Sequence, residues 1–237
     1  MLDSIRTKIF ADGADLETIT RLAADPVVSG FTTNPTLMSK AGVTDYAAFA
    51  QQVLSVIGDK PVSFEVFADD EAEIRRQAKL IASWGDNVYV KVPVTTTDGE
   101  STAALVRELS EGNIKLNVTG LFTTAQVELI AEALREGAPS CISVFAGRIA
   151  DAGIDPIAIM ARSVEIIEST AERAELIWAS PREVLNVVQA NAVGCHIITV
   201  THDLLAKLPS LGKDLDRFSL ETVQMFRNDA ISSGFSL

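Results

Sequence analysis

The chain has 237 residues, of which 47% are hydrophobic and 22% are charged, and its formal net charge is −12 at pH 7. This composition predicts a large apolar core and excludes a disordered chain, and the length lies in the range in which an α/β barrel forms one domain. So negative a chain disfavours nucleic acid and anionic membrane surfaces as partners, but a small anionic substrate needs only a local basic pocket.

The cysteines and the N-terminal segment bear on the compartment. Cys141 and Cys195 are the only two cysteines, and both lie in apolar runs, so a disulfide framework is not expected. Residues 1–10 carry several charges and lack an apolar core of the kind found in signal peptides. No run approaches the roughly 18 apolar residues that span a bilayer. We therefore expect a cytoplasmic protein with no membrane partner.

Short apolar segments rich in β-branched residues alternate with longer amphipathic segments along the whole chain. The pattern predicts strands over residues 8–12, 30–34, 61–67, 87–94, 115–120, 141–146, 175–179 and 195–200. Helices are predicted between them, for example over residues 71–84, 101–111, 123–136 and 181–190. A last helix, over about residues 219–231, has no strand after it.

Eight strands alternating with helices indicate parallel βαβ units, and this number of units in about 200 to 250 residues is typical of a closed barrel. An open, doubly wound sheet is the alternative. It would usually carry a glycine-rich phosphate loop after the first strand, and residues 11–15 (ADGAD) do not match one. We predict one (β/α)8, or TIM-barrel, domain over residues 1–237, with residues 219–237 as a C-terminal helix and tail.

Alternation of side chains along a strand predicts which residues face the barrel interior. In the segment 87–94, the valines at even positions fit the helix layer, so Tyr89, Lys91 and Pro93 point inward. The same rule directs these further side chains inward: Asp12, Thr32, Asn34, Ser63, Glu65, Phe67, Asn117, Thr119, Ser143 and Phe145. Most are polar and lie near the C-terminal ends of their strands, where barrel enzymes keep their active sites.

Lys91 is the strongest catalytic candidate. It lies within an apolar segment (NVYVKVPV), and burial favours the neutral, nucleophilic form of an amine. Such an amine attacks a ketone to give an imine, whose protonated form draws electrons from the neighbouring C–C bond and allows it to break. The alternative is a lysine at a strand end with its head in solvent. The polar residues predicted on the same inner face favour the catalytic interpretation.

Two carboxylates are candidates for proton transfer. Asp12 and Glu65 are predicted to move protons to and from a substrate hydroxyl, with Thr119 holding a water between them. Asp12 could instead be a turn or cap residue, whereas a buried, unpaired Glu65 would be costly. For Asp15 we predict an N-cap of the first helix.

Basic residues near strand ends are few. Arg148 and Arg182 each follow a predicted strand, a suitable place for a phosphate, although either could be an ordinary surface arginine. His196 and His202 show no ligand spacing with cysteines or carboxylates and are predicted to be structural. No metal and no cofactor is therefore expected, which disfavours a zinc-dependent aldolase.

Several of these residues lie in motifs that resemble the transaldolase family, specifically its small members related to fructose-6-phosphate aldolase. The matching stretches recur in order through nearly the whole chain, at residues 30–35 (GFTTNP), 90–94 (VKVPV), 143–149 (SVFAGRI), 179–182 (ASPR) and 194–199 (GCHIIT). The sequence departs from the family pattern at Gly13, where Thr or Ser is common, at Pro181, where an aromatic residue is usual, and in a longer segment 95–99.

The resemblance implies roles for the candidate residues. Lys91 would form the Schiff base, with Asp12 and Glu65 in acid/base roles and Thr119 holding the catalytic water. The implied substrate-binding residues are Thr32 and Phe145, Asn34, Asn117 and Ser143 for sugar hydroxyls, and Arg148, Ser180 and Arg182 for a terminal phosphate. The resemblance also implies a homo-oligomer, a pentameric ring or a decamer, with residues 218–226 of the last helix as a contact.

The leading hypothesis is a transaldolase that transfers a dihydroxyacetone unit from a ketose phosphate, such as fructose 6-phosphate or sedoheptulose 7-phosphate, to an aldose phosphate, chemistry of the kind found in the pentose phosphate pathway. In the resemblance, transaldolases carry glutamate and phenylalanine where this chain has Glu65 and Phe145, and the aldolase branch carries glutamine and tyrosine. The alternatives are a fructose-6-phosphate aldolase, a transaldolase for sulfonated sugars, and a catalytically silent barrel that binds sugar phosphates.

Overall fold

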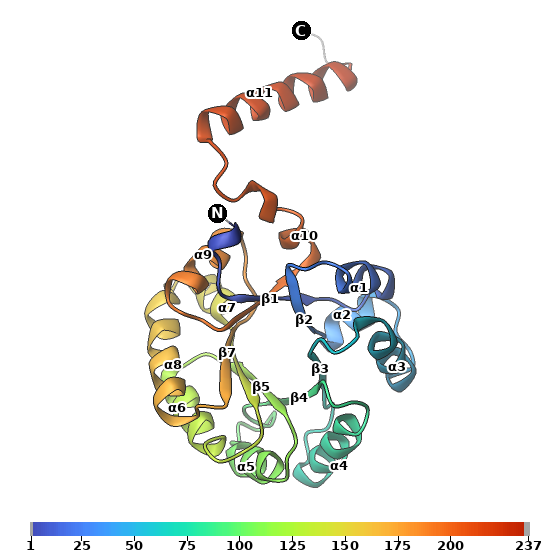
Figure 1. Ribbon diagram of the computed structural model, residues 1–237, viewed down its shortest axis with the longest axis vertical. Coiled ribbons are helices and arrows are strands. Elements are labelled where there is room, and N and C mark those ends of the chain that lie inside the picture. The colour runs from blue at the N-terminus through green and yellow to red at the C-terminus, as the bar shows by residue number, and fades with distance from the viewer. Residues whose placement is uncertain (1, 235–237) are drawn as a thin grey trace.

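The computed structural model describes residues 2–234, in which eight parallel strands close into a barrel and each pairs with its neighbours in chain order (Figure 1). The strands are β1 (Lys8–Asp12), β2 (Val28–Thr32), β3 (Val62–Glu65), β4 (Val88–Pro93), β5 (Leu116–Leu121), β6 (Ser140–Val144), β7 (Ala174–Trp178) and β8 (Ile197–Thr201). Pairing of β1 with β8 closes the barrel. The predicted (β/α)8 barrel is thus confirmed.

Helices surround the barrel on its outer side (Figure 1). The helices of the described residues are α1 (Leu16–Ala23), α2 (Pro35–Lys40), α3 (Tyr46–Ile57), α4 (Glu71–Ala82), α5 (Ala103–Glu111), α6 (Thr124–Ala133), α7 (Ala146–Asp151), α8 (Ile157–Thr170), α9 (Leu185–Ala192), α10 (His202–Leu205) and, beyond the barrel, α11 (Leu215–Ser232), with 3-10 turns at Leu2–Ser4 and Leu208–Ser210. None of the helices within residues 2–234 is long and apolar enough to cross a membrane.

The strands separate two apolar layers. Side chains of one parity, including Val88, Val90 and Val92 of β4, pack against the helices in the main core. Side chains of the other parity fill the barrel interior, where Phe10, Cys141, Ile177 and Ile197 form a small cluster with Tyr89 beside it. Both cysteines are free and buried. This arrangement agrees with the predicted parity of the strands.

Gly30 of β2 shows how tightly the barrel interior is filled. A Cβ atom at this position would lie 2.6 Å from the ring of Phe10 on the neighbouring strand. Because real Cβ atoms do not approach a ring so closely, only glycine leaves room for the Phe10 side chain. The Phe10 ring is buried in the small apolar cluster of the barrel interior.

Short polar residues fix the first turns of several helices. Asp15 accepts a hydrogen bond from the Thr18 N–H, which confirms its predicted role as the N-cap of α1. Asn34 caps α2 in the same way, since its Oδ1 accepts from the Leu37 N–H at 2.9 Å. The cap orients the Asn34 amide, so that its Nδ2 points toward the strand ends.

Two predicted helices begin about four residues away from the expected position. The helix expected from residue 181 begins at Leu185, because Ser180 adopts a φ of 56° and the Asn186 side chain accepts from the N–H groups of Arg182 and Glu183. The last helix begins at Leu215, four residues earlier than expected, since Asp214 supplies its N-cap. Residues 235–237 of the predicted tail lie outside the described residues.

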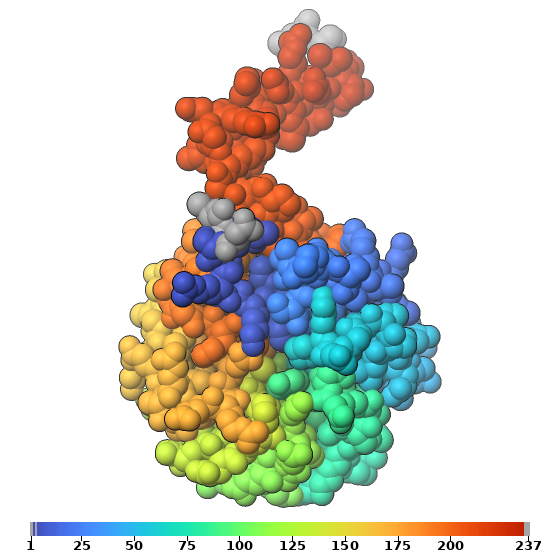
Figure 2. Space-filling model, viewed as in Figure 1, coloured from blue at the N-terminus to red at the C-terminus, as the bar shows by residue number. Residues whose placement is uncertain are grey.

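The C-terminal helix α11 stands clear of the barrel (Figures 1 and 2). None of its side chains is buried. It nevertheless carries large exposed apolar residues along its length, namely Leu215, Phe218, Leu220, Val223, Met225, Phe226 and Ile231. An amphipathic helix of this kind has an apolar surface without a partner among residues 2–234.

Candidate active site

A cavity of about 560 Å³ opens at the C-terminal ends of the strands. Every residue predicted for the site lines it: Asp12, Thr32, Asn34, Glu65, Lys91, Asn117, Thr119, Ser143, Phe145, Arg148, Ser180 and Arg182. These side chains come from seven different strands, the loops that follow them, and, for Arg148, helix α7. The barrel therefore brings together residues that are up to 170 positions apart in the sequence.

Lys91 lies in the middle of this cavity on β4, and only 8% of the residue is exposed. Its Nζ atom donates to Glu65 Oε2 at 3.0 Å and to the backbone carbonyl of Thr33 at 3.1 Å. The Thr33 carbonyl is a partner that side-chain parity does not reveal. A proton can pass between the Lys91 amine and the Glu65 carboxylate directly, since the two groups share a hydrogen bond.

Glu65 is held in turn through its backbone. The hydroxyl of Tyr46, from α3, accepts from the Glu65 N–H at 2.7 Å and lies 3.1 Å from the Glu65 carbonyl, to which it donates. The ring of Tyr46 packs edge-on against Trp84 and Phe64. Tyr46 thus fixes the end of β3 where pairing with β2 has ceased, a role that was not predicted because it depends on tertiary packing.

Asp12 ends β1 and receives hydrogen bonds from two neighbours. Thr32 Oγ1 donates to Asp12 Oδ1 at 2.8 Å, and Asn34 Nδ2 lies 3.3 Å from Oδ2. Burial raises the pKa of Asp12 above its ordinary value of 3.8, against the opposing effects of the positive charge on Lys91 and of these hydrogen bonds. A carboxylate with a raised pKa is a stronger base, which suits it to take a proton from a substrate hydroxyl group.

The floor of the cavity holds a second polar chain. Ser143 Oγ donates to Asn117 Oδ1 at 2.7 Å, and Asn117 Nδ2 donates to Ser63 Oγ at 2.9 Å. The amide of Asn117 is thereby fixed in one orientation. Nearby, the hydroxyl of Thr119 is buried and has no hydrogen-bond partner in the described structure. Such a group needs a water or a ligand to satisfy it.

Two arginines form the basic end of the cavity. Arg182 binds Asp151 of α7 with its Nε atom 3.0 Å from Oδ1, and Arg148 lies over the ring of Phe145, 5.2 Å from its centroid. The backbone of Ser180 passes so close to Gly147 that a Cβ atom there would lie 1.5 Å from the Ser180 carbonyl oxygen. Glycine at 147 therefore allows the loop that carries Ser180 and Arg182 to approach Arg148.

Comparison with known proteins identifies the family. Residues 9–236 match the model of the transaldolase/fructose-6-phosphate aldolase family. The chain belongs to this family. It is 37% identical over 201 residues to a probable transaldolase of Dehalococcoides mccartyi, covering 85% of this chain and 89% of that protein. It is 36% identical over 214 residues to a probable transaldolase of Streptococcus agalactiae, covering 89% and 95%.

Its likeness to one solved structure shows the fold alone. A crystal structure of an HpcH/Hpal aldolase/citrate lyase family protein from Burkholderia cenocepacia superimposes with a TM-score of 0.59 at 14% identity, and the match covers 94% of this chain and 98% of that one. The sequence-based prediction of a transaldolase-family enzyme is thus confirmed by the family and its relatives.

One residue predicted to face the barrel interior does not. Phe67 is 54% exposed, and its ring packs against Tyr46 at 4.6 Å between centroids. The prediction was wrong because β3 ends at Glu65, two residues earlier than expected, and alternation does not continue beyond a strand. Phe67 contributes to the outer rim of this transaldolase-family barrel.

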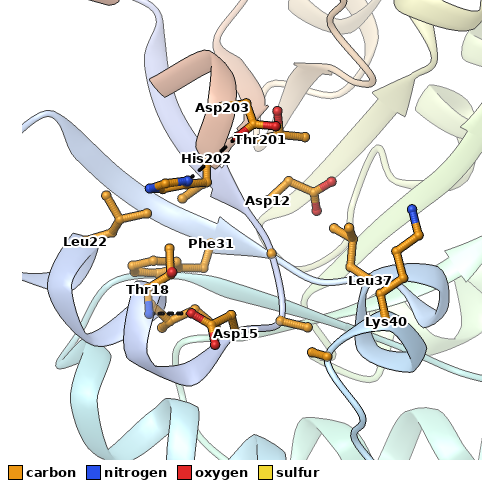
Figure 3. Close-up of a pocket in the computed structure, with 15 residues that line it drawn as sticks. Asp12, Asp15, Thr18, Leu22, Phe31, Leu37, Lys40, Thr201, His202 and Asp203 are labelled. Carbon is orange, nitrogen blue, oxygen red and sulfur yellow. Dashed lines mark hydrogen bonds and ion pairs between the residues drawn. The ribbon is translucent and has the colours of Figure 1, made fainter. Parts of the chain in front are cut away.

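A second cavity of about 530 Å³ adjoins the first and lies between β1, α1, α2 and α10 (Figure 3). It shares Asp12 and Leu37 with the cavity around Lys91. Figure 3 shows the Asp12 carboxyl group directed away from Leu22 and Phe31, which lie on the apolar side of this second cavity. Lys91 is not among the residues that line this second cavity.

Neither histidine lines the cavity around Lys91. His196 Nδ1 accepts from the Leu176 N–H at 3.0 Å, and His202 Nε2 lies 2.5 Å from Arg21 at the rim of the second cavity. Within residues 2–234, no group of three or more His, Cys, Asp and Glu side chains is placed to hold a metal ion.

Proposed function

We propose that the protein is a class I transaldolase, which transfers a dihydroxyacetone unit from a ketose phosphate to an aldose phosphate through a Schiff base on Lys91. The observation that carries this proposal is the Lys91 amine, which is buried in a polar cavity at 3.0 Å from Glu65. A barrel that only bound sugar phosphates would have no use for a buried amine paired in this way.

The first half of the proposed reaction begins with transfer of a proton from the Lys91 ammonium group to Glu65. The neutral amine attacks the ketone carbon, and the carbinolamine takes the proton back from Glu65 and loses water to form a protonated imine. Asp12 then takes the proton of the hydroxyl group on the far carbon of the scissile bond. The C–C bond breaks, its electron pair moves into the imine to form an enamine, and the aldehyde fragment leaves.

The second half reverses these steps with a different aldehyde. The enamine carbon attacks the acceptor carbonyl, and Asp12 returns its proton to the new hydroxyl group. Water then hydrolyses the imine and frees Lys91. The unsatisfied hydroxyl of Thr119 is suited to bind that water, because it lines the cavity and lacks a protein partner in the described structure.

The two ends of the cavity fit the two ends of such a substrate. We assign the hydroxyl groups near the imine to Asn117, Ser143 and Asn34, whose amide and hydroxyl groups face the cavity. We assign the terminal phosphate to Arg148, Arg182 and Ser180. Thr32 lines the same wall, but its hydroxyl group is engaged with Asp12.

Transfer is favoured over simple aldol cleavage by Phe145. This side chain lines the cavity, and its ring is covered on one side by Arg148. Phenylalanine offers no hydroxyl group to orient a water or protonate the enamine, so the enamine should persist until an acceptor aldehyde arrives.

The test compares release of glyceraldehyde 3-phosphate from fructose 6-phosphate with and without erythrose 4-phosphate. We expect release to be much faster with the acceptor present, and we expect Phe145→Tyr to raise cleavage relative to transfer. Equal release without an acceptor would replace the transaldolase proposal with an aldolase. A parallel assay with a sulfonated ketose tests the alternative of a transaldolase for sulfonated sugars, in which the basic end of the cavity binds a sulfonate.

We also propose that the protein is a homo-oligomer that uses α11 as a contact, because its apolar side chains have no partner within the described chain. Phe226→Asp should then reduce the molar mass measured by light scattering. Unchanged mass would exclude α11 from the contact. A cytoplasmic location is part of the proposal and is supported by the two free, buried cysteines.

A further inference from the structure

Thr199 contacts the proposed acid/base machinery, although the sequence motifs assign it no role. It lies on β8 with 8% of the residue exposed and lines the cavity around Lys91. Its Oγ1 atom is 2.5 Å from Oγ1 of Thr32, and Thr32 Oγ1 donates to Asp12 Oδ1 at 2.8 Å. The three groups form a chain of hydrogen bonds that ends at the Asp12 carboxyl group.

The direction of this chain follows from the number of hydrogens. A threonine hydroxyl group has one hydrogen, and Thr32 uses it on Asp12 when that carboxyl group is ionised. Thr199 must then be the donor to Thr32. When Asp12 carries a proton on the same oxygen, both hydroxyl groups can rotate, so that Asp12 donates to Thr32 and Thr32 donates to Thr199. Asp12 keeps a bonded partner in both protonation states.

The strand register explains how Thr199 reaches Thr32. Asp12 and Thr32 are Cα partners across β1 and β2, whereas Thr199 is paired with Phe10 across β1 and β8. Thr199 thus faces the barrel interior two residues before Thr201, the β8 partner of Asp12. Its hydroxyl group meets that of Thr32, which lies on the other strand beside β1.

We propose that Thr199 is a positioning residue, whose hydroxyl group holds Thr32 and thereby keeps the Asp12 carboxyl group in one orientation while a proton leaves and returns. The inference rests on the proposed transaldolase reaction, in which Asp12 takes a proton in the first half and gives it back in the second. Two hydroxyl groups in series suit this task because each can donate or accept.

The experiment measures steady-state transfer by the full-length protein and by Thr199→Val, with fructose 6-phosphate and erythrose 4-phosphate. Valine keeps the shape of threonine but removes the hydroxyl group. We expect kcat to fall about tenfold with little change in KM, and Thr199→Ser to restore kcat to within about twofold. Thr201→Val is the matched control. It lies two residues further along β8, is exposed at the second cavity (Figure 3), and should retain wild-type kcat.

A double-mutant cycle separates positioning from general disruption of the barrel. If Thr199 acts through Asp12, Thr199→Val should have almost no further effect on kcat in an Asp12→Asn background. An equal loss in both backgrounds, or a Thr199→Val protein with wild-type kcat, would overturn the inference. If Thr199→Val does not fold, the comparison is between Thr199→Ser and Thr199→Ala, and equal activity of these two would overturn it.

Failure of the underlying proposal has a different signature. A wild-type protein that transfers no dihydroxyacetone unit would overturn the transaldolase reaction and this inference together. A wild-type protein that transfers, with a Thr199→Val variant that shows no coupling to Asp12, would overturn the role of Thr199 alone.

Discussion

The lower and upper layers of the barrel interior are built by the same strands and differ in chemistry. Four strands place a residue in each layer, two positions apart along the strand, as the pairs Phe10 and Asp12, Tyr89 and Lys91, Cys141 and Ser143, and Ile197 and Thr199. The first member of each pair packs in or against the small apolar cluster, and the second lines the cavity. The position of a residue along its strand, rather than the strand to which it belongs, therefore determines whether it stabilises the apolar cluster or lines the cavity.

The two layers also depend on each other. The Phe10 ring is buried in the barrel interior, and Gly30 leaves the space for it. Buried polar groups of the upper layer need hydrogen-bond partners. The hydrogen-bonded chains through Asp12 and through Asn117 meet this requirement.

The largest expected contrast is between the two inward residues of β1. Phe10→Ala should lower the free energy of unfolding by about 3–5 kcal/mol, because it empties the centre of the apolar layer. Asp12→Asn should lower kcat by about 10²- to 10⁴-fold and leave the fold intact, because asparagine fits the same space but cannot accept a proton in the reaction. Urea unfolding and steady-state assays of both variants check this. A fully active Asp12→Asn protein would contradict the assignment of catalysis to the upper layer.

The same contrast can be tested on β6. Cys141→Ser introduces a hydroxyl group into the apolar layer and should destabilise the protein by about 1–3 kcal/mol. Ser143→Ala removes the donor to Asn117 Oδ1, so we expect a smaller effect on stability and a several-fold higher KM for the ketose. If the two substitutions gave the same pattern, depth in the barrel would not determine the role of a residue.

The inward-facing side chains of both layers were predictable from alternation, because the strands are regular over these residues. Asp12, Lys91, Asn117 and Ser143 face the cavity as predicted, since one shared parity places each of them inward. Alternation gives no information once a strand ends, and Phe67 was placed wrongly for this reason.

Contacts between distant segments could not be predicted in this way. The bond from Lys91 to the Thr33 carbonyl and the chain from Thr199 to Asp12 depend on the register between strands. Tyr46 reaches Glu65 only because α3 packs against β3. The pairing of Arg182 with Asp151 requires that α7 and the loop after β7 meet. The sequence pattern specifies the layer of a residue, whereas its partners require the assembled barrel.

The two arginines at the basic end of the cavity are expected to affect substrate binding much more than stability. Arg148→Ala should raise KM for phosphorylated substrates by about tenfold, and Arg182→Ala should raise it less, because Arg182 already shares its charge with Asp151. Neither change should alter unfolding by more than about 0.5 kcal/mol. Assays with an unphosphorylated ketose provide the control, and equal effects on that substrate would remove both arginines from the phosphate site.

The smallest expected effect is the folding stability that is lost because the Asp12 carboxyl group of the upper layer is buried. Because burial raises the pKa of Asp12 above 3.8, the folded protein retains a proton that the unfolded chain releases, so the wild type loses stability as pH rises from 3.8 through the raised pKa. Asp12→Asn lacks this loss and should become the more stable protein over that window and above it.

The pKa of Asp15 is shifted in the opposite direction, so its effect on the pH dependence of stability should have the opposite sign. Hydrogen bonds from Thr18 lower its pKa below 3.8, so its contribution to stability is present at higher pH and is lost as pH falls through the lowered value. Asp15→Asn should therefore be less stable than wild type near neutral pH, with the difference shrinking in acid. Urea unfolding of the three proteins across this range measures both signs, and a wild type that equals or exceeds Asp12→Asn in stability at neutral pH would contradict the raised pKa.

The proposed reaction requires that the buried amine of Lys91 forms a covalent imine with the substrate. Sodium borohydride reduces a protonated imine to a stable amine, so treatment in the presence of fructose 6-phosphate should inactivate the enzyme and add the sugar fragment to the peptide that carries Lys91. The same treatment without the sugar, or of Lys91→Met with it, should leave no adduct. Mass spectrometry that located the adduct on another lysine, or a Lys91→Met protein that still transferred, would contradict the account.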